Sequence, residues 1–241
     1  MYINFRYFII VLSYKKGLFL MEEIVEKLKL INKKISKIIS NNNLSKSPEI
    51  IAISKTFNLE KITPLLKFGH IHFGENKVQE AENKWSQVKN THKKLQLHMV
   101  GKLQSNKVKK AIQLFDYIHS LDSESLAKKI SIQTKELNKK TKIFIQVNTG
   151  EENQKSGIYL NQLSDFYKFC VKELSLNVIG LMCLPPLDAD THEHFKILKE
   201  KSIELNLQDL SMGMSSDYEN ATINGATFLR LGTEIFGKRN I

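Results

Sequence analysis

The sequence contains little proline and little cysteine, and it has no long run of apolar residues. Only 4 prolines occur among its 241 residues, and no Ser/Gly-rich linker follows residue 48, so nothing marks a second domain boundary. A single domain of this length buries well over half of the surface that its unfolded chain exposes. We therefore expect one domain over residues 21–241. Residues 1–20 are expected to form an extension that is disordered or lies before a native start at Met21.

The shortage of cysteine bears on the compartment in which the protein works. Cys170 and Cys183 are too few for a disulfide framework and form no Cys-x-x-Cys pair, which favours a reducing compartment and hence the cytoplasm. The apolar stretches 7–12 and 18–21 are separated by two lysines. A membrane-spanning helix needs about 18 apolar residues, so we expect no membrane span. No small-residue cleavage site follows these stretches, as a secretory signal would require.

The formal net charge of +11 raises the question of a nucleic-acid partner, because clustered lysines gain affinity by releasing counterions from phosphates. The lysines here are not clustered. They are spread through nearly every segment of helical pattern, which is typical of solvated helix faces. The charge pattern therefore gives little support to a basic nucleic-acid-binding module as the function.

Several catalytic motifs are also missing. The segment GKLQSNK at 101–107 lacks the two spaced glycines of a nucleotide-binding P-loop. His192 and His194 lie two apart on an expected helix and so point in different directions, and we expect no metal site. The sequence shows no Gly-x-Ser-x-Gly elbow and no spaced carboxylate pair that would indicate a hydrolase.

An amphipathic helix is expected before the main domain, over residues 22–40. Its apolar residues recur at alternating spacings of four and three, which places them on one stripe; they are Ile24, Leu28, Ile31, Ile35 and Ile38. Residues 41–48 are rich in Asn, Ser and Pro, which favours a loop.

After this loop, eight short apolar runs alternate with stretches of helical length. The runs are 50–54, 71–73, 95–100, 117–120, 143–148, 178–183, 210–212 and 228–231. Eight successive βα units predict an α/β fold, a single (β/α)8 TIM barrel with an extra N-terminal helix. A doubly wound open sheet is the alternative.

Barrels of this kind carry their chemistry at the carboxyl ends of the strands, so polar residues that end an apolar run are the candidates. Lys55 directly follows the run IIAIS. An amine at the end of a buried strand is partly desolvated, which disfavours the ammonium form and suits a Schiff-base lysine. The alternative is a lysine that reaches from the rim into solvent.

The last two runs end in small residues. Residues 211–217 read SMGMSSD and residues 230–233 read RLGT, and such residues let backbone N–H groups and hydroxyls surround an anion. Barrels commonly bind phosphate after strands seven and eight. Ser215, Ser216 and Thr233 are equally good helix N-caps, and the two roles are compatible.

Seven segments together resemble the pyridoxal phosphate homeostasis proteins, a family related to the N-terminal domain of alanine racemase. The segments are IAISK (51–55), HFGENKVQEAENKW (72–85), LHMVGKLQSNK (97–107), NTGEENQKSG (148–157), GLMCLPP (180–186), LSMGMSSDYENATI (210–223) and RLGTEIFG (230–237). The resemblance spans about residues 22–239. Residues 1–20 and the pair Thr222-Ile223 depart from it.

The resemblance implies a barrel that binds pyridoxal 5'-phosphate (PLP) and lacks the racemase's C-terminal β domain. It assigns the Schiff base to Lys55 and places Arg230 opposite the pyridine nitrogen. Ser215, Gly232 and Thr233 would hold the phosphate, with Met214 adjacent through its backbone. The remaining residues that would line the site at strand ends are Asn76, His98, Lys155 and Met182.

The implied function is that of a PLP carrier and regulator of vitamin B6 and amino-acid or keto-acid balance, without established turnover. A permanent cation opposite the pyridine nitrogen weakens the ring as an electron sink, and the racemase's catalytic tyrosine belongs to the missing domain. We accordingly expect a cytoplasmic monomer whose recipients are PLP enzymes in their apo form. The alternative is a PLP-dependent amino-acid racemase or lyase that takes its base from a partner chain.

Overall fold

Eight parallel strands close into a barrel in sequence order, and β8 pairs back onto β1. The computed structural model describes the backbone of residues 3–238 and the side chains of residues 22–238. The strands are β1 (Glu49–Ile53), β2 (His72–Glu75), β3 (Gln96–Met99), β4 (Tyr117–Leu121), β5 (Lys142–Val147), β6 (Val178–Cys183), β7 (Asp209–Ser211) and β8 (Phe228–Leu231). The TIM barrel is thereby confirmed and the open sheet excluded.

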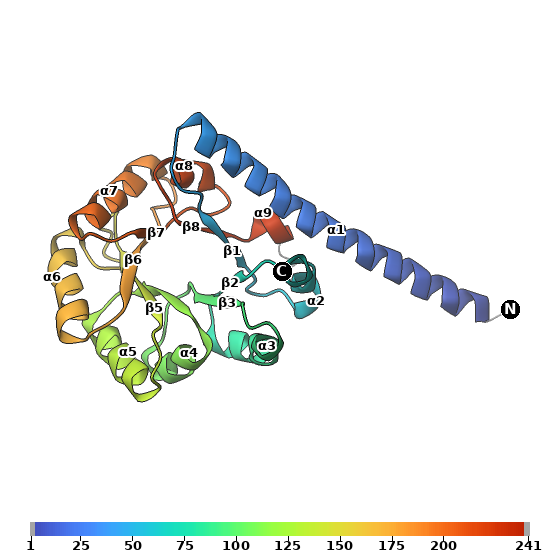
Figure 1. Ribbon diagram of the computed structural model, residues 1–241, viewed down its shortest axis with the longest axis horizontal. Coiled ribbons are helices and arrows are strands. Elements are labelled where there is room, and N and C mark those ends of the chain that lie inside the picture. Colours follow the sequence, from blue (N-terminus) through green and yellow to red (C-terminus); the bar gives the residue numbers. More distant parts are fainter. Residues whose placement is uncertain (1–2, 239–241) are drawn as a thin grey trace.

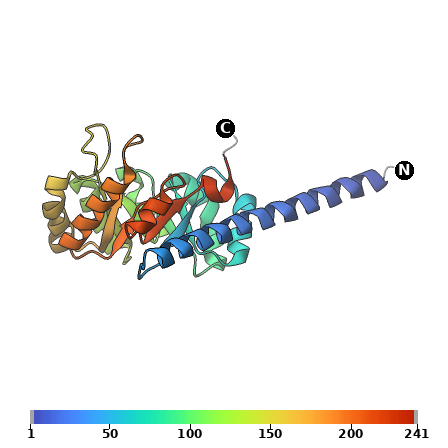
Figure 2. The same ribbon diagram turned by 90° about the horizontal axis from the view of Figure 1, so that it is seen from above.

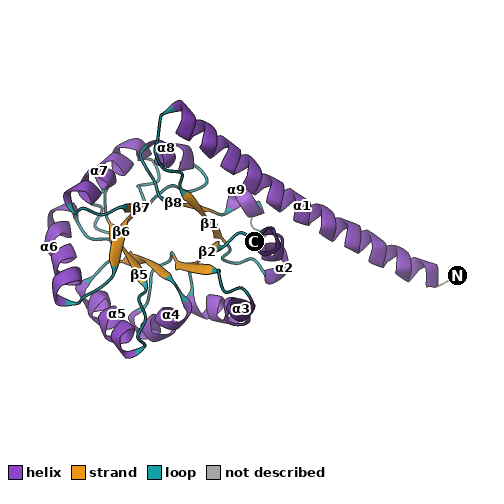
Figure 3. Ribbon diagram, viewed as in Figure 1, coloured by secondary structure: helices purple, strands orange, loops and turns teal. Residues whose placement is uncertain are grey.

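Helices surround the barrel on its outside (Figures 1 and 3). They are α1 (Ile3–Asn41), α2 (Leu59–Phe68), α3 (Val78–Thr91), α4 (Val108–Leu114), α5 (Glu124–Glu136), α6 (Leu163–Lys168), α7 (Thr191–Glu204), α8 (Tyr218–Ile223) and α9 (Thr233–Phe236). Short 3-10 helices precede α4 and α6, η1 (Ser105–Lys107) and η2 (Leu160–Gln162), and a π-helical turn, η3 (Phe169–Glu173), follows α6.

The expected N-terminal helix is present as α1, which packs on α2, α8 and α9. Its predicted stripe is buried at Ile24, Leu28, Ile31 and Ile35. The helix begins at Ile3, and its first half extends beyond the barrel (Figures 1 and 2). Side chains before Glu22 lie outside the described residues, so a separate extension over 1–20 stays a prediction. In the part of the chain that is described, no helix combines the length and apolarity needed to cross a membrane.

Side chains alternate along each strand between the helix layer and the barrel interior. The interior is filled by a small apolar cluster, the inner cluster, which consists of Ile51, Ile53, Tyr117, Phe144, Met182 and Phe228. Gly74 makes room for it, because a Cβ there would lie 2.5 Å from the Cδ1 atom of Ile53. The barrel is therefore a packed core, and ligands are confined to its ends.

Candidate functional site

The carboxyl mouth of the barrel is built from the loops that follow the strands. Two of these loops, after β5 and β6, rise above the helices from one edge of the barrel (Figure 2). Lys55 follows β1 at this mouth and is half-buried. Ser54 points into the helix layer, where its hydroxyl donates to Glu75 Oε1 at 2.7 Å.

A buried carboxylate anchors the segment that carries Lys55. Glu75 is fully buried, and its Oε1 accepts hydrogen bonds from Ser54, from Lys84 Nζ at 2.9 Å and from Trp85 Nε1 at 2.9 Å. Lys84 also donates to the carbonyl of Ser54 at 2.9 Å. Helix α3 thus holds the end of β1 from outside the barrel.

The residue after Lys55 adopts a left-handed backbone conformation. Thr56 has φ 69°, a region that costs a non-glycine residue about 1–2 kcal/mol. Its amide donates to Glu80 Oε1 at 2.6 Å, and a charge-assisted bond of this kind offsets the strain. Lys84 pairs with the same Glu80 oxygen at 3.1 Å, so one cation supports both acidic residues.

Replacing Lys84 with Met is expected to lower the free energy of unfolding by about 3 kcal/mol, because it leaves the Glu75 carboxylate buried without a cation. The double variant Lys84→Met, Glu75→Gln should regain part of this loss, since it removes the buried charge and keeps an acceptor for Ser54 and Trp85. Urea unfolding measures both. Equal stability of Lys84→Met and the parent would show that the pair does not hold this segment.

Arg230 lies in the neighbouring strand, where its Cα pairs with that of Ile51. The residue is 5% exposed, and burial lowers the pKa of its guanidinium from the usual value, although an arginine stays charged in proteins. Nη1 donates to Ser211 Oγ at 2.8 Å and Nη2 to the carbonyl of Cys183 at 2.9 Å. Both hydrogen-bond partners are neutral, and the negative charge of Asp217 acts on the guanidinium without a hydrogen bond between them among the described contacts.

The residues expected to hold a phosphate meet where β7 and β8 end. Ser215 Oγ accepts from the amide of Glu234 at 3.4 Å, which joins the loop after β7 to the first turn of α9. Gly232 precedes this turn and Thr233 begins it. The amide of Met214 instead donates to Asp217 Oδ1 at 2.6 Å, so the backbone N–H expected to lie beside the phosphate has a partner within its own loop.

Two further predicted residues lie at the mouth. Asn76 follows β2, and its Oδ1 atom is buried without a hydrogen-bond partner among the described residues. Gly101 allows the loop after β3 to approach it, because a Cβ there would lie 2.4 Å from the carbonyl oxygen of Asn76. Lys155 lies in the loop after β5 and pairs with Glu152 at 2.6 Å. An unsatisfied buried amide oxygen next to the mouth is suited to a ligand that donates a hydrogen bond.

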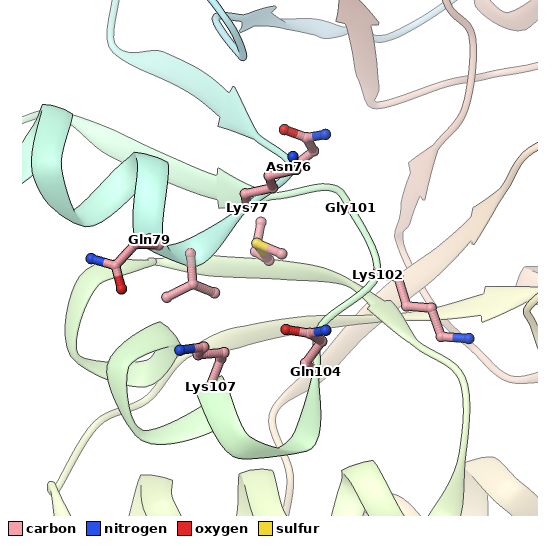
Figure 4. Close-up of a pocket in the computed structure, with 9 residues that line it drawn as sticks. Asn76, Lys77, Gln79, Gly101, Lys102, Gln104 and Lys107 are labelled. Carbon is pink, nitrogen blue, oxygen red and sulfur yellow. The ribbon is translucent and has the colours of Figure 1, made fainter.

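A pocket of about 480 Å³ adjoins Asn76 between the ends of β2 and β3 (Figure 4). The described residues that line it include neither Lys55 nor Arg230. Its polar lining consists of Asn76, Lys77, Gln79, Lys102, Gln104 and Lys107. The pocket therefore lies beside the Lys55 mouth, and its three lysines make this flank attractive to anions.

His98 and Met182 lie deeper than predicted from their positions near strand ends. Both are fully buried, and Met182 belongs to the inner cluster. The His98 ring uses both nitrogens within the barrel, at 2.9 Å from His72 and from His119. Both side chains point inward beneath the loops of the mouth, and their contribution to the lining of the site stays a prediction.

Comparison with known proteins shows the family of this chain. The sequence profile of the alanine racemase N-terminal domain matches residues 34–240. Pyridoxal phosphate homeostasis proteins of Pasteurella multocida (strain Pm70) and Aquifex aeolicus (strain VF5) are 34% and 36% identical, covering 81% and 79% of this chain and 90% and 87% of their own. This chain belongs to the pyridoxal phosphate homeostasis protein family. The resemblance predicted from the seven segments is confirmed.

This chain also resembles solved structures in its fold. PipY of Synechococcus elongatus PCC7942, solved with PLP bound, is 33% identical with a TM-score of 0.71, covering 84% of this chain and 100% of its own. PipY has also been solved without PLP. Alanine racemase of Clostridium difficile 630 shares the fold at 14% identity and a TM-score of 0.66, covering 91% of this chain and 57% of its own.

Proposed function

We propose that the chain binds PLP at the carboxyl mouth, in a Schiff base on Lys55, and acts in vitamin B6 homeostasis. The observation that carries this proposal is the placement of a half-buried lysine directly after β1 and of a buried arginine with neutral hydrogen-bond partners on β8, the strand paired with β1. The unsatisfied Oδ1 atom of Asn76 fits a ligand with donor groups. The names of the relatives, and PLP in PipY, point to the same cofactor.

Each residue has a distinct task in this proposal. Lys55 supplies the amine that retains the cofactor, and the Glu75–Lys84 pair fixes the segment from which that amine projects. Arg230 faces the pyridine nitrogen and, as a permanent cation, disfavours its protonation. Bound PLP supplies an electron sink for amino-acid chemistry, and this arginine keeps the sink shallow. The arrangement suits a carrier better than a racemase.

Thr233→Val and Ser215→Ala are each expected to weaken PLP retention, because each removes a hydrogen bond to a charged group worth about 1.5–3 kcal/mol. Equilibrium dialysis of the single and double variants measures the dissociation constant. Thr63→Val is the matched control, since that hydroxyl only donates to the carbonyl of Leu59 on α2. A double variant that binds PLP as the parent does would place the phosphate elsewhere.

The proposed function also includes a compartment, an oligomeric state and partners. We propose a cytoplasmic monomer that regulates amino-acid and keto-acid balance and passes PLP to apo enzymes. A carrier transfers its cofactor without changing amino acids, whereas a racemase or lyase exchanges their α-protons. Incubation of the PLP-loaded protein with a panel of amino acids in deuterated water separates the two, because only an enzyme incorporates deuterium with turnover.

A further inference from the structure

Three histidines and a serine form a continuous hydrogen-bonded chain through the barrel interior. His72 Nδ1 lies 2.9 Å from His98 Nε2, and His98 Nδ1 lies 2.9 Å from His119 Nε2. His119 Nδ1 lies 2.8 Å from Ser211 Oγ, to which Arg230 donates. All four residues are 8% exposed or less. The chain thus links strands β2, β3, β4 and β7 to the arginine of the proposed site.

The direction of every hydrogen bond in this chain follows from Arg230. A guanidinium can only donate, so Ser211 Oγ accepts from it, and the remaining described partner of this hydroxyl is His119 Nδ1. A buried hydroxyl proton needs an acceptor, and Ser211 is fully buried, so the hydroxyl donates to His119. A neutral imidazole has one donor and one acceptor, so His119 donates through Nε2 to His98. His98 in turn donates through Nε2 to His72.

The surroundings keep these rings neutral and fixed. Burial lowers the pKa of His98 and of His119 well below the usual 6.5, and that of His72 to about 4. His98 stacks on Tyr117 with ring centroids 4.2 Å apart, and His119 stacks on Phe144 at 4.4 Å. The chain ends where His72 Nε2 lies 3.9 Å from the carboxylate of Glu49, whose side chain is 65% exposed.

We propose that His119, supported by His98 and His72, is a positioning residue that holds the Arg230 guanidinium through Ser211. His119 accepts a hydrogen bond from the Ser211 hydroxyl. This bond orients the hydroxyl so that its lone pairs face Arg230. The inference rests on the proposed function in so far as Arg230 serves PLP. It adds to that function a second set of residues, which reaches from the mouth to the opposite end of the barrel.

The first test needs no cofactor. In the full chain before PLP is added, NMR of the imidazole nitrogens should show His72, His98 and His119 as neutral rings protonated at Nε2. Ser211→Ala should alter the signals of His119, which loses its donor. His119 protonated at Nδ1 would overturn the proposed direction of the chain, whatever the protein binds.

The second test uses two substitutions of His119, one that keeps its ring stacking and one that keeps its hydrogen-bond acceptor. Phe keeps the stack on Phe144 but cannot accept from Ser211, whereas the Oδ1 atom of Asn can take the place of Nδ1. We expect His119→Phe and Ser211→Ala to weaken PLP retention roughly tenfold, the lower end for a bond to a charged group, and to shift the absorption band at full occupancy. His119→Asn should stay close to the parent.

Tyr117→Phe is the matched control inside the barrel, because its ring stacks on His98 while its hydroxyl only accepts from Lys142 at 2.8 Å. Binding and spectrum should both survive this change. Arg230→Lys tests the proposed site itself. If this variant retains PLP as the parent does and shows the same absorption band, the proposed function is refuted. If Arg230→Lys alters the band but His119→Phe and Ser211→Ala do not, the proposed site stands and the positioning role is wrong.

Discussion

Acidification below pH 6.5 is expected to destabilise this barrel steeply, through the buried histidines of its interior. His98, His119 and His72 have pKa values lowered by burial, the last to about 4. Below pH 6.5 the unfolded chain binds protons that the folded chain refuses, so stability is complete above that pH and falls toward pH 4. Each ring contributes about 1.4 kcal/mol per pH unit in this window. Together they remove roughly 8 kcal/mol by pH 4.5, about the whole stability of many domains.

Urea unfolding at a series of pH values between 7.5 and 4.5 measures this loss. Burial also lowers the pKa of His70 to about 4, so His119→Asn removes one of four such rings and should reduce the slope by about a quarter. His92→Gln is the control, because His92 lies exposed at the end of α3. A free energy of unfolding that stays constant down to pH 5 would mean that these rings take up protons equally in the folded and the unfolded chain, so that burial does not lower their pKa values.

Lys55→Ala is expected to abolish the visible absorbance of the PLP-loaded protein completely, because the other amine at the end of β1, that of Lys84, is held outside the barrel by Ser54 and Glu75. The fold should survive, with the free energy of unfolding changed by less than about 1 kcal/mol, since a substitution at the rim opens no cavity in the core. Absorption spectra after gel filtration in the presence of PLP measure the loss, and urea unfolding checks the fold.

Lys102→Ala is the matched control for this experiment. Lys102 lines the neighbouring pocket (Figure 4), so its removal tests whether nearby positive charge alone retains the cofactor. We expect Lys102→Ala to show the same absorption spectrum as the parent. Retained absorbance in Lys55→Ala, or its loss in Lys102→Ala, would move the attachment to the flank between β2 and β3.

The barrel was predictable because its strands are buried on both faces and read as short apolar runs. The strands found, such as Glu49–Ile53 and Tyr117–Leu121, agree with the predicted runs to within one or two residues at each end. The short helices α4, α8 and α9 were not predicted. They are too short to show a helical period, and tertiary packing rather than local pattern stabilises them.

The candidate site was predictable only in part. Lys55 could be found from its position after a buried run, whereas the role of Arg230 came from the family resemblance, since an arginine within an apolar strand gives no sign of its partner. The roles of His72 and His119 were missed. Each lies on a different strand, and only the closure and register of the barrel bring their rings within hydrogen-bonding distance of His98.

Borohydride reduction of the PLP-loaded protein identifies the lysine that carries PLP. Reduction converts a Schiff base into a stable secondary amine, so the lysine that held PLP keeps the pyridoxyl group through proteolysis and is identified by mass spectrometry. We expect a single modified peptide, and this peptide contains Lys55. Modification of Lys102, Lys107 or Lys155 in its place, or the absence of any modified peptide, would contradict it.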